Sequence, residues 1–220
     1  LCISMLIALP CFWQIHIPAG DLPRHLYNAS LATILQKGPV AGLQLAPIWT
    51  NKLSEWIWSH LFGSLTGRWL EASLPAAAAE IFFWGALFWI RRATGIWTWP
   101  ITPLLAMVTY GVVFHLGFLN FFLSTGLVFW SIGLLWQFSF GGAIAAAGFA
   151  AVACLAHPLP VLWAASVLLA VAMLRSIQNT NRKWILIAGV ASLAAVRLLL
   201  TATFPVRSSW AVEPPLGMML

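Results

Sequence analysis

Long apolar runs, separated by segments that hold most of the charged residues, are the feature that most constrains the fold of this chain. A helix that crosses a membrane requires about 20 mostly apolar residues. The runs that approach or reach this length are Leu1–Pro18, Ser73–Ile90, Ile101–His115, Leu119–Gln137, Gly141–Ala156, Leu159–Leu174 and Trp184–Phe204. They predict an all-α fold, a polytopic transmembrane helix bundle of about seven spans. We expect this bundle to form a single module over residues 1–220.

The composition excludes a soluble domain. Hydrophobic residues make up 61% of the chain and charged residues 7%, whereas soluble domains carry roughly 25% charged residues. The net charge of +6 comes from basic residues scattered between apolar runs, so we interpret them as topology determinants and expect no nucleic-acid partner. Because the chain begins with Leu1 and stops where a new apolar stretch begins, we expect a fragment truncated at both ends.

Basic turns predict the orientation of the bundle, because short loops rich in Lys and Arg stay in the cytoplasm. Arg91 and Arg92 form one such turn, and Arg175, Arg182 and Lys183 form another. This assignment places residues 19–72, the turn at 115–120 and the turn at 157–160 on the outer face. We expect a multi-pass protein of the bacterial inner membrane, with its polar site on the periplasmic side.

The segment 19–72 has the pattern of two interfacial amphipathic helices rather than that of a free loop. Asp21 is a plausible N-cap of the first helix, which Gly38 ends, and Asn51 is a plausible cap of the second, which extends toward Gly67. We further divide the apolar stretch 101–137 into two helices at Gly117 and Asn120, since it is too long for one crossing.

Asp21 and His25 are the strongest candidates for catalysis. They lie one helical turn apart, so their side chains face the same way. Such a pair could act as general base and orienter, or could supply two ligands to a divalent cation. The alternative is that Asp21 only caps the helix and that His25 is merely exposed.

Two short motifs are similar to those of a known family. The series Asp21-Leu22-Pro23-Arg24-His25-Leu26, directly after the first span, and the turn Gly117-Phe118-Leu119-Asn120-Phe121 resemble motifs of bacterial GT-C membrane glycosyltransferases. The resemblance covers nearly the whole chain, although many members have two adjacent acidic residues where Leu22 follows Asp21 here. It implies transfer of a sugar from a polyprenyl-phosphate donor, with Asp21 as the catalytic base.

Further polar residues are candidates for substrate binding. Arg24 belongs to the first motif, and His115, Asn120 and His157 lie in outer turns, where helix-end capping is the alternative role for each of these three. Glu80 and Arg197 lie at similar depth within predicted spans, where an isolated charge costs on the order of 2.5–3.5 kcal/mol. They could pair with each other, Arg197 could bind the donor phosphate, or Arg197 could extend outward to the interface.

Three functions are compatible with these features. The first is a GT-C-like glycosyltransferase whose partners are membrane lipids and a lipid-linked sugar donor, with a divalent cation as a possible cofactor. The second is a transporter or lipid flippase with Glu80 and Arg197 along its path, and the third is a membrane scaffold without catalysis. A transport path needs polar residues at successive depths, and the scarcity of such residues in the middle spans favours a surface site.

Overall fold

The computed structural model describes residues 2–13, 17, 19–38, 42, 51, 53–60, 68–96, 98–137 and 139–177, with isolated positions at 191, 194, 195 and 198. Every regular element in these ranges is a helix, which confirms the all-α prediction for them. The helices are α1 Cys2–Trp13, α2 Leu22–Lys37, α3 Leu53–His60, α4 Arg68–Thr94, η1 Trp99–Ile101, α5 Thr102–Thr109, α6 Val112–His115, α7 Leu119–Trp136, α8 Phe140–Ala156 and α9 Pro158–Ile177.

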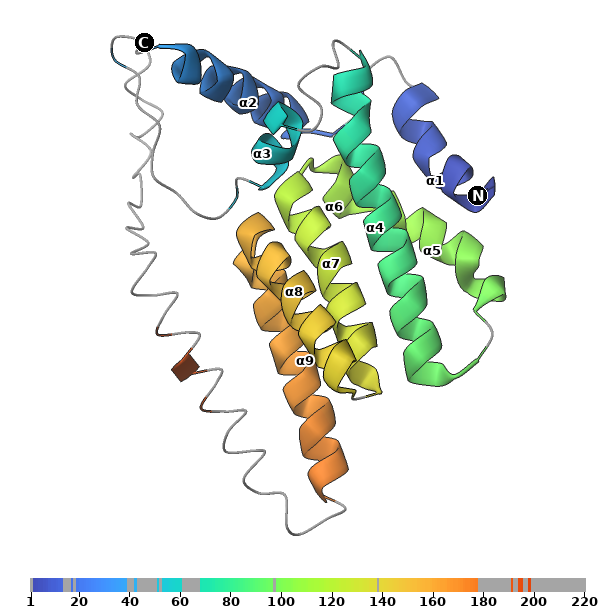
Figure 1. Cartoon of the computed structure of the whole chain (residues 1–220). Helices are drawn as coiled ribbons and strands as arrows, with labels where there is room; N and C mark the ends of the chain where they lie inside the picture. Colours follow the sequence, from blue (N-terminus) through green and yellow to red (C-terminus); the bar gives the residue numbers. More distant parts are fainter. Residues whose placement is uncertain are drawn as a thin grey trace, which may run out of the picture. The chain divides into compact units, whose positions relative to one another are not determined.

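The chain divides into two compact units, residues Leu1–Ala164 and Ala165–Leu220. In the first unit α4 and α7 lie side by side at the centre, with α8 against α7 and α1 against α4 (Figure 1). Helices α2 and α3 pack on each other at one end of this bundle (Figure 1). The described part of the second unit is mainly the end of α9, a continuous helix to Ile177.

Close contact between α4 and α7 forms the core of the first unit. The rings of Phe82 and Phe122 stack with their centroids 4.6 Å apart. A Cβ atom added at Gly126 would lie 2.8 Å from the backbone nitrogen of Phe82, so the two helices approach almost backbone to backbone. Such small-residue contacts are typical of helix packing in membranes, where no hydrophobic effect drives helices together.

Among the residues that the structure describes, two helices are long and apolar enough to cross a membrane, Glu71–Thr94 and Leu119–Trp136. They correspond to the predicted spans Ser73–Ile90 and Leu119–Gln137. The apolar helices Cys2–Trp13, Phe140–Ala156 and Pro158–Met173 are shorter, and the predicted span Trp184–Phe204 lies almost entirely outside the described residues. Seven spans are therefore not established.

The predicted helix Ile101–His115 is interrupted at Tyr110 and Gly111, where α5 ends and α6 begins. Gly111 is extended and has low helix propensity. The Tyr110 hydroxyl donates to the carbonyl of Ile7 and lies 3.6 Å from the Cys11 sulfur, which ties the break to α1. These tertiary contacts replace the single continuous helix expected from the apolar run, whereas the predicted boundary at Gly117 is confirmed.

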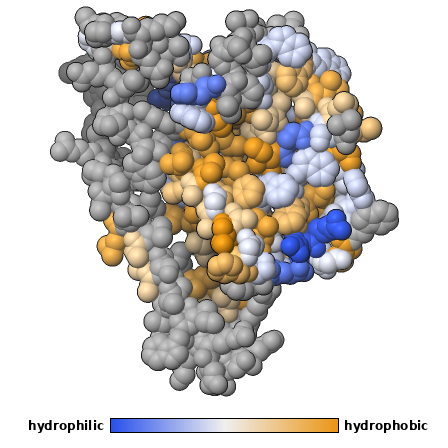
Figure 2. Space-filling view, viewed as in Figure 1, coloured by the Kyte–Doolittle hydropathy of each residue, from blue (hydrophilic) through white to orange (hydrophobic). Residues whose placement is uncertain are grey.

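Large apolar side chains lie exposed on the first unit, and Figure 2 shows hydrophobic residues over the middle of its described surface. They include Met5, Leu6, Leu104, Met107, Val112 and Ile144. A soluble monomer rarely exposes so extended an apolar surface. This surface is compatible with contact to lipid.

Candidate functional site

The site lies where the chain enters α2, and its backbone is fixed by the turn between α6 and α7. The amide of Gly20 donates to the His115 carbonyl at 2.9 Å, and the amide of Asp21 donates to the Leu116 carbonyl at 3.1 Å. Gly117 has φ of +75°, and a Cβ atom there would lie 2.4 Å from the Asp21 nitrogen. Only glycine fits this turn without moving the loop that carries Asp21.

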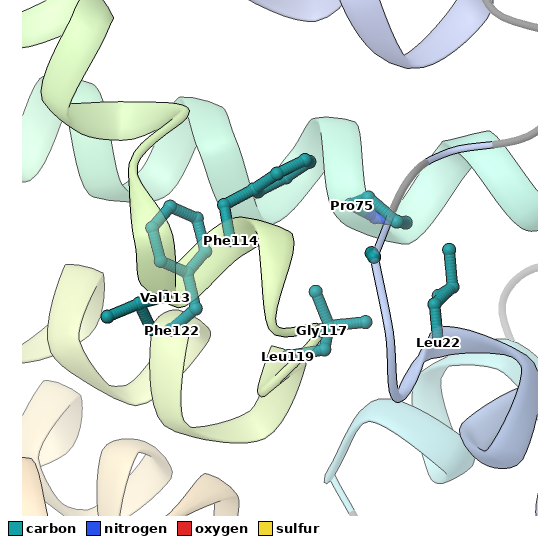
Figure 3. A pocket seen from close by; sticks show the side chains of 8 residues that line it. Leu22, Pro75, Val113, Phe114, Gly117, Leu119 and Phe122 are labelled. Atoms are coloured by element: carbon teal, nitrogen blue, oxygen red, sulfur yellow. The ribbon is translucent and has the colours of Figure 1, made fainter.

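Below this turn the packing is tight and apolar. A cavity of about 10 Å³ is lined by Ala19, Leu22, Pro75, Val113, Phe114, Gly117, Leu119 and Phe122. Figure 3 shows that these side chains come from the Asp21 loop, from α4 and from both sides of the Gly117 turn. The space is about the minimum for one water molecule and has apolar walls, so it supports the loop and does not bind a ligand.

Asp21 occupies the N-cap position of α2, as predicted, and Gly38 follows its last residue. The Asp21 side chain makes no capping hydrogen bond, and its φ and ψ of −94° and −4° are helical rather than extended. A side chain reaches the first helical amides from extended backbone. The alternative in which Asp21 acts as a helix cap is therefore wrong for this structure, and the carboxylate is left for other contacts.

Asp21, Arg24, His25 and Glu55 form one group, which we call the acid–histidine cluster. His25 Nδ1 lies 3.0 Å from Glu55 Oε1, while His25 Nε2 lies 3.7 Å from Asp21 Oδ2. The His25 side chain is 14% exposed and that of Asp21 32%. The predicted pairing of Asp21 with His25 is thus present, and His25 is held between two carboxylates rather than merely exposed.

Arg24 completes the cluster on its solvent side. Its Nη1 lies 3.9 Å from Asp21 Oδ1, and its side chain is 76% exposed. An ion pair of this length and exposure contributes little to stability. The guanidinium remains accessible to an anionic group of a substrate, such as a phosphate.

Glu55 was not among the predicted site residues. Glu55 lies 30 residues after His25, on the short helix α3, and only the packing of α3 on α2 brings the two together. Its Oε2 is buried and has no hydrogen-bond partner among the described residues. A charged residue on the apolar second amphipathic helix was the one available hint.

Asn120 fixes α3 in place. Its Oδ1 accepts from the amide of Ser54 at 3.0 Å, and its Nδ2 donates to the carbonyl of Asn51 at 2.9 Å. The Asn120 side chain is buried, so both polar ends are satisfied by protein. Asn120 was predicted as a substrate-binding residue, and the structure places it behind the cluster, next to the residue that precedes Glu55.

The two other predicted histidines lie outside the cluster, His115 at the end of α6 and His157 between α8 and α9. His115 supplies its backbone carbonyl to the Asp21 loop, and its side chain is exposed. His157 Nδ1 accepts from the amide of Leu159 at 3.2 Å, so the ring caps the start of α9. Partial burial lowers the pKa of His157 because the charged imidazolium loses hydration.

Glu80 lies on α4, away from the cluster. Its Oε2 accepts from the indole nitrogen of Trp84 at 2.7 Å, and the same nitrogen donates to Ser4 of α1 at 3.1 Å. Its Oε1 is buried without a partner among the residues that the structure describes. Arg197 lies outside the described residues, so the pairing of Glu80 with Arg197 stays a prediction.

Across the described ranges, no group of three or more His, Cys, Asp or Glu side chains is arranged to hold a metal ion. No protein-family model, curated protein or solved structure matches this chain.

Proposed function

We propose that this chain is a multi-pass membrane protein that transfers a sugar from a polyprenyl-phosphate donor to a hydroxyl acceptor, in the manner of GT-C glycosyltransferases. The reaction takes place at the acid–histidine cluster, on the outer face of a bacterial inner membrane. The main support for this proposal is the position of the Asp21 carboxylate. It stands at a helix start without capping it and faces both an imidazole and an accessible guanidinium.

The cluster provides the groups that such a transfer requires. The acceptor hydroxyl gives its proton to the Asp21 carboxylate while its oxygen forms a bond to the anomeric carbon of the sugar. The bond between that carbon and the phosphate oxygen breaks, and the polyprenyl phosphate leaves with the bonding electrons. Arg24 neutralises the developing phosphate charge.

An apolar groove supports a lipid-linked substrate. Its volume is about 490 Å³, and it is lined by Phe82, Leu104, Met107, Val108, Gly111, Val112, Val113, Phe121, Phe122 and Thr125. Val113 and Phe122 line both this groove and the small cavity below the Asp21 loop. Its apolar walls suit a hydrocarbon chain.

A transporter or flippase is less well supported. The hydroxyls of α7 are used within the protein: Ser124 donates to the His157 carbonyl, Thr125 to the Phe121 carbonyl and Ser131 to the Ala146 carbonyl. Along α7, polar side chains are thus paired with backbone rather than directed into a path. A surface site accounts for the polar residues better.

The test is transfer by the protein in lipid nanodiscs, with undecaprenyl-phosphate-linked radiolabelled hexose as donor and an extract of envelope glycans as acceptor. We expect Asp21→Asn to lower transfer by about 10²–10⁴-fold, since the amide cannot take the proton. Binding of undecaprenyl phosphate should stay unchanged. His60→Gln, on α3 outside the cluster, is the control variant and should leave transfer unchanged. A folded, fully active Asp21→Asn protein would remove Asp21 from the mechanism.

A further inference from the structure

Glu55 holds His25 more closely than any other group of the acid–histidine cluster. Its oxygen lies 3.0 Å from Nδ1, within hydrogen-bond distance, and its side chain is 16% exposed. Asp21 is more exposed and lies 3.7 Å from Nε2, beyond hydrogen-bond distance. The two ends of the imidazole ring are therefore in different situations.

The hydrogen bond fixes where the imidazole carries its hydrogen. An ionised carboxylate only accepts, so Nδ1 must donate to Glu55. In the neutral ring Nε2 then has a lone pair and no hydrogen. Nε2 and the Asp21 carboxylate are two acceptors that face each other with no donor between them, which accounts for their separation of 3.7 Å.

We propose that Glu55 is a positioning residue that keeps His25 in the Nδ1–H tautomer. It thereby makes the gap between His25 and Asp21 a site for a hydrogen-bond donor, the acceptor hydroxyl. A hydroxyl beside this gap lies next to both acceptors, Nε2 of His25 and the carboxylate of Asp21. The assignment of the hydroxyl to a sugar acceptor rests on the proposed function, whereas the tautomer does not.

The surroundings of Glu55 are built to hold it still. Asn120 fixes the start of α3 through Ser54 and Asn51, and the Asn51 amide also donates to the Ala156 carbonyl at 3.2 Å. Trp58 is buried one turn further along the same helix. The second carboxylate oxygen of Glu55 is buried without a partner among the described residues. Such an unsatisfied group is unfavourable for stability, and a functional role is one reason for a protein to keep it.

Nitrogen NMR of the protein in nanodiscs, labelled at histidine nitrogens and without substrate, tests the tautomer directly. At a pH high enough for neutral imidazoles we expect the Nδ1–H form for His25, whose signal is identified by its loss in His25→Gln. Glu55→Ala should change it to the Nε2–H form that free imidazole prefers. Glu55→Gln should keep the Nδ1–H form, because its amide oxygen can accept. Unchanged His157 signals report that each variant is folded.

An Nε2–H tautomer in the unmodified protein would overturn the proposal, even if Glu55→Ala fails to fold. So would a folded Glu55→Ala protein with an unchanged tautomer. In the transfer assay Glu55→Ala should lower kcat by about 100-fold at unchanged donor KM, since a misplaced catalytic group costs on this order. Glu55→Gln should recover most of this loss. If Asp21→Asn proves active while the tautomer result holds, the proposed function fails and the role of Glu55 stands.

Discussion

The three titratable side chains at the centre of the site have different surroundings, although two of them, Asp21 and Glu55, are both carboxylates. Glu55 and His25 are mostly buried and hydrogen-bonded to each other, whereas Asp21 faces an exposed arginine. The spacing of Asp21 and His25 was readable from sequence because it depends on one helical turn. The contact with Glu55 was not, because it depends on how two separate helices pack.

We expect His157 to make the free energy of unfolding depend on pH. Its pKa is lowered in the folded protein, so at neutral pH and above both folded and unfolded states hold it neutral. As the pH falls below about 6.5, the unfolded state takes up a proton that the folded state resists, and the free energy of unfolding decreases. This decrease continues until the pH reaches the lowered pKa of the folded state.

We therefore expect His157→Asn to flatten the loss of stability in mild acid. Asparagine can still accept from the Leu159 amide at the start of α9, so the two proteins should have similar thermal unfolding midpoints at high pH. Thermal unfolding across the acid range measures the difference. Parallel curves for the two proteins would show that His157 does not contribute.

At the scale of elements, the Gly117 turn connects the bundle to the site. A substitution to alanine there adds a Cβ 2.4 Å from the Asp21 nitrogen. Gly95 is the matched control, because its φ of +67° is also positive but nothing lies within 4 Å of an added Cβ. Both alanine variants incur about 1–2 kcal/mol for the left-handed backbone.

Gly117→Ala should lose more stability than Gly95→Ala and should also disturb the Asp21 loop. The additional loss is on the order of 1–3 kcal/mol, as for other overpacked sites. Chemical unfolding in detergent gives the difference, and the His25 NMR signal reports the loop. Equal losses for the two variants would mean that the loop moves freely away from Gly117.

Element boundaries followed the sequence where local chemistry decides them. Helix α2 begins next to Pro23, which suits the first turn of a helix, and the boundary before α7 follows from Gly117, which needs a positive φ. The break between α5 and α6 was missed because the Tyr110 hydroxyl contacts α1, about 100 residues away in sequence. A pattern of apolar residues contains no information on that contact.

In the whole molecule, α4 is the helix on which the predicted orientation depends most. Asn28 on α2 and Ala93 near the end of α4 are both exposed. If α4 crosses the membrane, cysteines at these positions react with an impermeant thiol reagent from opposite sides. The exposed native Cys2 is replaced first. Labelling of both positions from one side would contradict the crossing.

The most direct test of the central claim is a density map of the protein in nanodiscs with a non-hydrolysable undecaprenyl-phosphate sugar analogue. We predict the phosphate beside Arg24, the anomeric carbon next to Asp21 and the hydrocarbon chain in the apolar groove of α4, α5, α6 and α7. Density for the phosphate at the opposite end of α4, near Arg91 and Arg92, with an empty acid–histidine cluster, would contradict the account.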